Sequence, residues 1–243
     1  MKLTITGSGS GKPTAGKNLS SILLENPPHL FLLDCGEPVA RVLAERNLDV
    51  DEIEAVIITH FHPDHSSGIY MLLQLFHIRK RTRKLKLFLP ENIELFQKSL
   101  SLFYLFPEKL LFALEILPIA QLNNEYPWLS IIDNDHLLNY RKIIAETGSS
   151  NEMRSCSIFI EADRKTLYTS DTENLKSLTS ALDLAELVIL DALHPAPQKV
   201  WELLQTKKTV VLTHGLHHEL ATRLAADNST GAIIAYDGLE IEI

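Results

Sequence analysis

The sequence is poor in cysteine and contains no long apolar run. Its two cysteines, Cys35 and Cys156, show no Cys-x-x-Cys spacing, so neither a disulfide framework nor a cysteine metal site is indicated. No stretch approaches the roughly 18 uninterrupted apolar residues of a membrane helix. Residues 1–4 open directly into a strand pattern and not into a signal peptide. We therefore expect a cytoplasmic protein without a membrane partner.

Positive charge is also scarce. Lysine and arginine together number 23 against 31 aspartates and glutamates, which gives a formal net charge of −8. This balance disfavours broad, non-specific attraction to nucleic acid. One run departs from the average, because six basic residues follow closely on one another: Arg79, Lys80, Arg81, Arg83, Lys84 and Lys86. Such a run is either a solvated helix end and loop or a surface that holds an RNA backbone.

The hydrophobic pattern predicts short strands interleaved with helices. At 243 residues the chain can bury one sizeable core, so residues 1–243 are expected to form a single domain. Strands are expected at residues 2–6, 21–25, 30–34, 55–58, 84–89, 141–145, 157–161, 166–169, 187–191, 209–213 and 232–236. Helices are expected at residues 39–46, 69–77, 90–106, 108–117, 175–182, 198–204 and 217–226. This alternation suits strands that are covered by helices on one face.

One histidine-rich motif, H-x-H-x-D-H at residues 60–65, stands where a strand turns into a helix. In extended chain, side chains two apart point the same way, so His60 and His62 face one side together. The turn at Pro63 then brings Asp64 and His65 back to the same place. Three imidazoles and a carboxylate in six residues suit zinc, or else manganese, iron or nickel. The alternative is a histidine-rich loop that binds no metal, a less common origin of this spacing.

The motif does not stand alone. L-D-C-G-E precedes it at residues 33–37, and T-S-D-T follows it at residues 169–172. Together these segments resemble the metallo-β-lactamase superfamily of metallohydrolases over nearly the whole chain. The resemblance is strongest to the branch that holds ribonuclease Z and the cyclic phosphodiesterase of phosphonate degradation. It implies an α/β fold, a four-layer αββα sandwich in which two mixed β-sheets pack face to face with helices outside.

The resemblance also implies a site for two metal ions. His60 and His62 would bind the first ion, and Asp64 and His65 would bind the second. Asp171 would bridge the two ions, and His214 would complete the second site. A bridging carboxylate can hold two ions about 3.5–4 Å apart with a hydroxide between them. Asp34 would lie behind the ligands and orient them.

A further histidine has an expected catalytic role beside Asp64. Residues 190–195, L-D-A-L-H-P, resemble the segment that carries the catalytic histidine of the phosphonate-pathway enzyme. His194 would then protonate the leaving oxygen, since imidazole titrates near neutrality. The alternative is an exposed loop histidine. Ribonuclease Z has His-Glu-Ala-Thr here and a protruding glycine-rich arm, and this sequence shows neither, which weakens a role in transfer-RNA processing.

One ligand of the family pattern is missing. Family members place a histidine before the strand expected at residues 157–161, and no histidine occurs between His136 and His194. Glu146 or Asn151 could substitute, His136 could come in from an earlier turn, or the first metal could keep two histidines and water. We favour the last explanation, a weakened first site.

These features predict a metal-dependent hydrolase, a phosphodiesterase that cleaves a small or cyclic phosphodiester by attack of a metal-bound hydroxide. One alternative is a ribonuclease Z-like endoribonuclease that holds RNA with the basic run at residues 79–86. Another is a catalytically weak binding or sensing protein whose first metal site is degenerate. Lactamases and thioesterases share the scaffold. Four aromatic residues lie at or near the end of the 90–106 helix: Phe103, Tyr104, Phe106 and Phe112. They form either part of the core or a dimer face, so a homodimer is possible.

Overall fold

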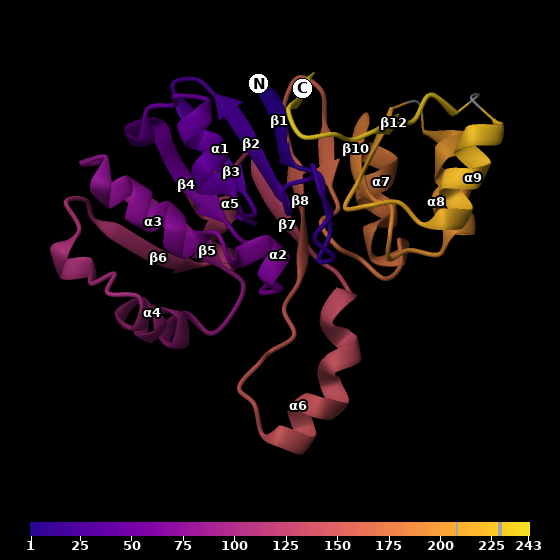
Figure 1. Cartoon of the computed structure of the whole chain (residues 1–243). Helices are drawn as coiled ribbons and strands as arrows, with labels where there is room; N and C mark the ends of the chain where they lie inside the picture. Colours follow the sequence, from indigo (N-terminus) through magenta and orange to yellow (C-terminus); the bar gives the residue numbers. More distant parts are fainter. Residues whose placement is uncertain (208, 228–229) are drawn as a thin grey trace.

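Two β-sheets pack face to face between outer layers of helices in the computed structural model, which describes residues 1–207, 209–227 and 230–243 (Figure 1). The expected α/β sandwich is therefore confirmed. The first sheet has the order β13-β1-β2-β3-β4-β5-β6. Its strands are β13 (Leu239–Glu242), β1 (Lys2–Gly7), β2 (Ser21–Asn26), β3 (His29–Leu33), β4 (Ile53–Ile57), β5 (Leu85–Leu89) and β6 (Leu114–Pro118).

The second sheet has the order β12-β11-β10-β9-β8-β7. Its strands are β12 (Ile233–Ile234), β11 (Val210–Thr213), β10 (Leu187–Asp191), β9 (Thr166–Tyr168), β8 (Cys156–Ile160) and β7 (Leu129–Asp133). Both sheets are mixed. Strands β3 to β6 run parallel in the first sheet, and strands β9 to β12 run parallel in the second. The carboxyl ends of each parallel set therefore meet at one edge.

Helices cover the outer faces of both sheets. The α-helices are α1 (Val39–Glu45), α2 (Pro63–Ser66), α3 (Ile69–Ile78), α4 (Ile93–Leu102), α5 (Leu122–Glu125), α6 (Arg141–Thr147), α7 (Thr179–Leu184), α8 (Pro197–Thr206) and α9 (His218–Ala226). Short 3-10 turns join them: η1 (Val50–Glu52), η2 (Pro107–Lys109), η3 (Ile119–Gln121), η4 (His136–Tyr140) and η5 (Lys176–Leu178). No helix in the described part of the chain has the length and apolar character to cross a membrane.

Three apolar clusters hold the layers together. The central cluster lies between the sheets and includes Leu3, Phe31 and Ile158, each at most 2% exposed. A second cluster joins the first sheet to α1, α3 and α4, and a third joins the second sheet to α7, α8 and α9. Burial of apolar surface is the main favourable term in folding, so these clusters fix the sheets against each other. The edges where the parallel strands end are thereby held in place.

Two expected elements are wrong. Residues 108–117 were expected to be a helix, but residues 114–118 form β6, which pairs in parallel with β5 from Leu85↔Leu114 to Leu89↔Pro118. Residues 141–145 were expected to be a strand, but they lie in α6, which ends at Gly148 with a left-handed φ of 65°. Short apolar runs fit either structure, and pairing in the folded chain decides between them. Strands β7 and β13 were not expected, and α4 ends at Leu102, before residue 106.

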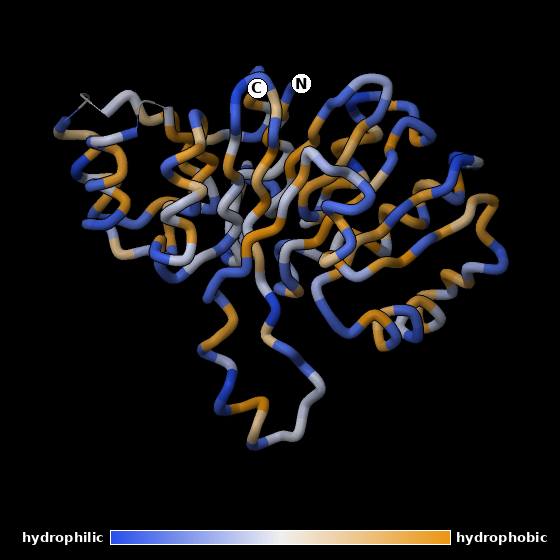
Figure 2. Tube along the Cα trace, turned by 180° about the vertical axis from the view of Figure 1, so that it is seen from behind, coloured by the Kyte–Doolittle hydropathy of each residue, from blue (hydrophilic) through white to orange (hydrophobic). Residues whose placement is uncertain are grey.

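One segment leaves the sandwich. Helix α6 and the loop that leads to β8, residues 141–154, project from the body as an arm (Figure 1). A glycine-rich arm was not expected, and this arm consists of a helix and a loop with Gly148 as its one glycine. Hydrophobic stretches lie on the arm as well as inside the sandwich (Figure 2). The arm is therefore not a purely polar loop.

Candidate metal centre

Seven histidine and aspartate side chains from both sheets converge at one edge of the sandwich. Six of them were expected as ligands: His60, His62, Asp64, His65, Asp171 and His214. The seventh is His136. The motif residues follow β4, Asp171 follows β9, and His214 follows β11. These strands belong to the parallel sets, whose carboxyl ends share an edge of each sheet. The strand ends thus bring residues up to 154 positions apart into one site.

The first cluster holds three histidines and one carboxylate. Nε2 of His136 lies 3.0 Å from Nδ1 of His62 and 3.5 Å from Oδ2 of Asp171. Nε2 of His60 lies 3.9 Å from the same Asp171 oxygen. One ligand atom from each of the four residues falls within 4.8 Å of the others. Three imidazole nitrogens and a carboxylate oxygen form a donor set suited to a tetrahedral zinc ion.

His136, one of the alternatives that the sequence left open, lies beside the first two histidines of the motif. It is 4% exposed and begins η4, a turn that follows β7 and precedes the arm. Its ring therefore reaches the place where a histidine from the loop before β8 was expected. Glu146 and Asn151, the other candidates for that place, are both exposed, and Glu146 belongs to none of the clusters in the described chain. The first cluster is complete without them.

The second cluster shares Asp171 with the first. Nε2 of His65 lies 3.2 Å from Oδ1 of Asp171, and Nε2 of His214 lies 3.0 Å from Oδ2. Oδ2 of Asp64 lies 3.6 Å from both histidine nitrogens. Oδ2 of Asp171 faces His136 of the first cluster as well as His214 of the second, so this side chain is common to the two clusters. That arrangement matches the bridging position expected for it.

Outer hydrogen bonds fix the ligand rings. Asp34 is fully buried, and its carboxylate lies 2.8 Å from Nδ1 of His65. It also accepts hydrogen bonds from the main-chain N–H of Thr59 at 2.8 Å and from the hydroxyl of Tyr168 at 2.7 Å. The proton of His65 is thus held on Nδ1, so Nε2 faces the cluster with its lone pair. Asp34 lies behind the ligands, as expected, whereas Tyr168 was not foreseen.

His214 has a comparable partner. Oγ of Ser20 lies 2.9 Å from its Nδ1, so the tautomer that donates to Ser20 leaves Nε2 free. The sequence around Ser20 and Tyr168 has no spacing that predicts these hydrogen bonds to His214 and Asp34.

The glycine-rich loop at residues 7–13 borders the same edge, where a Cβ on Gly11 would lie 3.3 Å from Oδ2 of Asp64.

Backbone strain gathers at this edge. Asp34, Ser170 and His214 have φ values of 61°, 50° and 62°, in the left-handed region that non-glycine residues rarely adopt. Each follows a strand and turns a side chain of the site or its neighbour inward. Strain of this kind persists where surrounding contacts over-determine it, and it is common at functional sites.

His194 sits at the rim and pairs with Asp191. Its Nδ1 lies 2.9 Å from Oδ2 of Asp191 and 3.8 Å from Oδ2 of Asp171, and its side chain is 27% exposed. Burial alone would lower its pKa, but the hydrogen bond that His194 donates to Asp191, together with the nearby carboxylates, raises the pKa of His194 to about 9. The expected catalytic histidine is therefore anchored at one nitrogen and partly open to solvent.

The residues present fit a pair of divalent ions. Four buried atoms that face one another have no hydrogen-bond partner in the described structure: His60 Nε2, Asp64 Oδ2, His65 Nε2 and Asp171 Oδ1. Each such atom costs about 1–3 kcal/mol unless something satisfies it. Burial also holds the pKa of His60 well below its usual range, which favours the neutral form that binds metal. Nitrogen and oxygen donors of this kind suit zinc and its first-row neighbours.

The basic run at residues 79–86 lies elsewhere. Arg81 is 1% exposed and donates to the main-chain carbonyls of Val50, Ile53 and Lys84, so it cannot hold RNA. Lys84 pairs with Glu115 at 2.8 Å. The run precedes β5, whereas the metal centre follows the carboxyl end of the parallel neighbour β4. It therefore stands at the opposite edge of the sheet, and the expected RNA-holding role of Arg81 is wrong.

Comparison with known proteins identifies the class that this fold and site define. The chain superimposes on the metallo-β-lactamase fold protein YhfI from Bacillus subtilis with a TM-score of 0.74 at 19% identity, over 100% of this chain and 99% of that one. It superimposes on human tRNase Z, short form, with a TM-score of 0.71 at 19% identity, over 100% and 99%. The protein therefore has the metallo-β-lactamase fold.

The family can be stated more narrowly. Residues 1–205 match the family model described as anti-Pycsar protein Apyc1, and the chain belongs to this family. It is also 34% identical over 93 residues to the ribonuclease Z of Methanothermobacter thermautotrophicus, a stretch that spans 38% of this chain and 30% of that protein. The match thus spans about a third of the length of the curated relatives.

Proposed function

We propose that this protein is a metal-dependent hydrolase that cleaves a small or cyclic phosphodiester. One arrangement carries the proposal: two metal-binding clusters that share Asp171, with the pair of Asp191 and His194 at their rim. Two-metal sites of this kind serve in-line displacement at phosphorus. The similarity to ribonuclease Z, a phosphodiester-cleaving class by name, supports the same chemistry.

The chain's own residues would hold the metals and the substrate. When bound, the two ions would supply Lewis acidity at a phosphoryl oxygen and an activated water. His60, His62 and His136 would hold the first ion. Asp64, His65 and His214 would hold the second, and Asp171 would contact both. Asp34 and Ser20 keep Nδ1 of the two histidines of the second set occupied, so Nε2 stays directed at the site.

His194 would act as the proton donor. Its Nδ1 donates to Asp191, and in the imidazolium form, which a pKa of about 9 favours, Nε2 carries the second proton, the one that can pass to the leaving oxygen. The two main-chain N–H groups that Asp191 accepts, from Leu193 and His194, keep this carboxylate in place. The pair thus supplies an oriented acid within reach of the shared Asp171.

The experiment is turnover by the metal-loaded protein on bis-p-nitrophenyl phosphate and on a nucleoside 2′,3′-cyclic phosphate. We expect metal-dependent turnover on at least one of them. His194→Gln should lower kcat by about 100-fold or more, since general acids contribute about 10²–10⁴-fold. His77→Gln is the control, because His77 is exposed on α3 and lies in none of the clusters. Absence of metal-dependent turnover on both substrates would count decisively against the proposal.

An endoribonuclease is the second candidate, favoured by the similarity to ribonuclease Z at 34–36% identity over 93 and 103 residues. The buried Arg81 and the distant basic run remove the surface first expected to hold RNA. Binding that rests on several phosphate contacts should weaken steeply between low and moderate salt. A flat salt response, or no binding, excludes this candidate. The third idea, a sensing protein with a degenerate first site, was motivated by a missing histidine, and the position of His136 beside His60 and His62 supports a full donor set there instead.

A further inference from the structure

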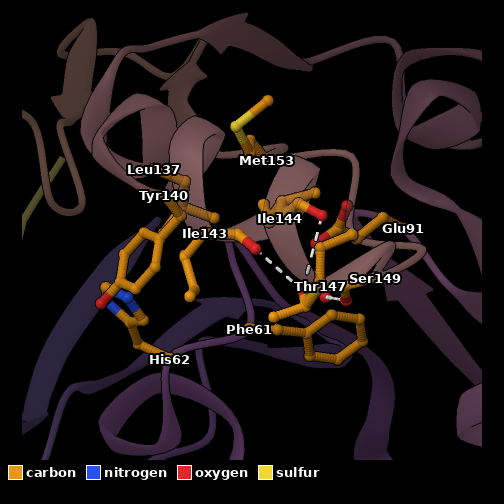
Figure 3. Close-up of a pocket in the computed structure, with 11 residues that line it drawn as sticks. Phe61, His62, Glu91, Leu137, Tyr140, Ile143, Ile144, Thr147, Ser149 and Met153 are labelled. Atoms are coloured by element: carbon orange, nitrogen blue, oxygen red, sulfur yellow. Dashed lines mark hydrogen bonds between the residues drawn. The ribbon is translucent and has the colours of Figure 1, made fainter.

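A cavity lies between the projecting arm and the first metal cluster. It has a volume of about 310 Å³, and its lining includes Phe61 and His62 from the motif and Tyr140, Ile143, Ile144 and Thr147 from the arm and the turn before it (Figure 3). We call it the arm pocket. Apart from His62, none of these side chains is needed for the chemistry at the metals, so the pocket calls for a separate explanation.

The arm pocket is tied directly to the metal centre. Phe61 stands between His60 and His62 in the motif, and His62 itself lines both the pocket and the first cluster. On the other side, Tyr140 follows His136 by four residues in η4, and its ring centroid lies 5.6 Å from that of His62. Figure 3 shows Tyr140 and His62 side by side. A group attached to a phosphate at the metals would therefore meet this pocket next.

The walls of the pocket are mostly apolar. Helix α6 directs Ile143 and Ile144 into it, while Lys142 and Glu146 point outward and lie 3.8 Å apart. Ile143 and Tyr140 stay 50% and 47% exposed, although both are large apolar or aromatic side chains. Apolar surface left in water costs free energy roughly in proportion to its area. A ligand that covers these two side chains would recover that cost.

The polar groups of the pocket are already engaged. Thr147 donates to the carbonyl of Ile143 at 2.8 Å, and Ser149 donates to Asn151. Glu91 accepts from the main-chain N–H of Glu152. Among the described residues that line the pocket there is no lysine or arginine. A second anionic group would therefore find no partner there, whereas an uncharged apolar group would lose nothing.

We propose that the arm pocket binds an uncharged apolar substituent, such as an aryl ring, carried by the phosphoester that the metal centre holds. The inference rests on the proposed function. An apolar cavity of about 150 Å³ is enough for one benzene ring, so this pocket has room for a ring with its own substituents. Ile143 and Tyr140 then determine specificity and take no part in the chemistry.

Titration of the metal-loaded protein with methyl phosphate and with phenyl phosphate, followed by calorimetry, tests this. Both monoesters present the same phosphate, so their ratio of Kd values reports the substituent alone. We expect phenyl phosphate to bind about tenfold more tightly, the scale of one partly buried ring. In the double variant Tyr140→Ala, Ile143→Ser the ratio should fall to within about twofold of one, with the Kd of methyl phosphate unchanged.

Ile78→Ser is the matched control, because Ile78 is 64% exposed at the end of α3 and does not line the pocket. Equal Kd values for the two monoesters in the natural protein would overturn the pocket inference and leave the proposed function standing. The same holds if the control loses the preference as fully as the double variant. Failure of methyl phosphate to bind at all would overturn the proposed function and the inference together.

Discussion

Nε2 of His136 lies 3.0 Å from Nδ1 of His62, although 74 residues separate them in the chain. Two imidazole nitrogens approach this closely when one donates a proton to the other or when both face a common cation. The neighbouring Nε2 of His60 and the carboxylate of Asp171 favour the common cation, because they add two further donors at the same place. Burial lowers the pKa of His136 to about 4, so this ring is neutral at physiological pH and ready to bind metal.

Metal content should separate the two clusters. We expect two equivalents of metal per chain in the natural protein, one in His136→Ala and none in Asp171→Ala, because only the aspartate serves both clusters. Elemental analysis of the purified proteins measures this, with the exposed His77→Ala as the control. Two equivalents in His136→Ala would show that the first ion does not depend on this histidine.

The hydroxyl of Tyr168 should matter for metal affinity. Tyr168→Phe removes the 2.7 Å hydrogen bond to Asp34 and leaves that carboxylate less firmly aimed at His65. Loss of such an outer partner typically lowers metal affinity about 10–100-fold. Competition with a chelator measures the change. Tyr70→Phe is the control, since its hydroxyl bonds to Ser99 away from the site, and an unchanged affinity in Tyr168→Phe would refute the orienting role.

Arg81 should contribute to stability and not to the site. Arg81→Met leaves the carbonyls of Val50 and Ile53 without a donor in a buried setting, which we expect to lower the free energy of unfolding by about 2–4 kcal/mol. Urea unfolding measures this. Arg83→Met is the comparison, because Arg83 is about half exposed and should change stability by less than about 1 kcal/mol. Equal effects would contradict the buried role.

Activity should fall on the alkaline side. Burial opposes protonation of His194, but Asp191 and the other carboxylates raise its pKa to about 9. A general acid works while protonated, so kcat stays high below that pKa and declines as pH rises through it. Bound cations repel the imidazolium, which moves the decline to lower pH. A pH profile of kcat checks this, and His194→Gln should lose the alkaline limb; a limb that persists in the variant belongs to another group.

The sequence was informative wherever a motif and a strand end coincide. His60, Asp171 and His214 each follow an expected strand, and the family resemblance assigned them to one site; the structure places those strand ends at shared edges. His136 carries no such local signal, because its role depends on how η4 packs 74 residues after His62. Helix α6 was mistaken for a strand since its two isoleucines fit either period. The sequence-based predictions were wrong or silent where contacts between distant parts of the chain decide the structure.

The arm and the first metal ligand are one continuous piece of chain. His136 begins η4, Tyr140 ends it, and α6 starts at the next residue. With an ion held by His136 as proposed, displacement of the arm would shift a ligand of that ion, and loss of the ion would free the chain segment that begins the arm. By thermodynamic reciprocity, a molecule that holds the arm in place tightens the first ion by the same factor that the ion tightens the molecule.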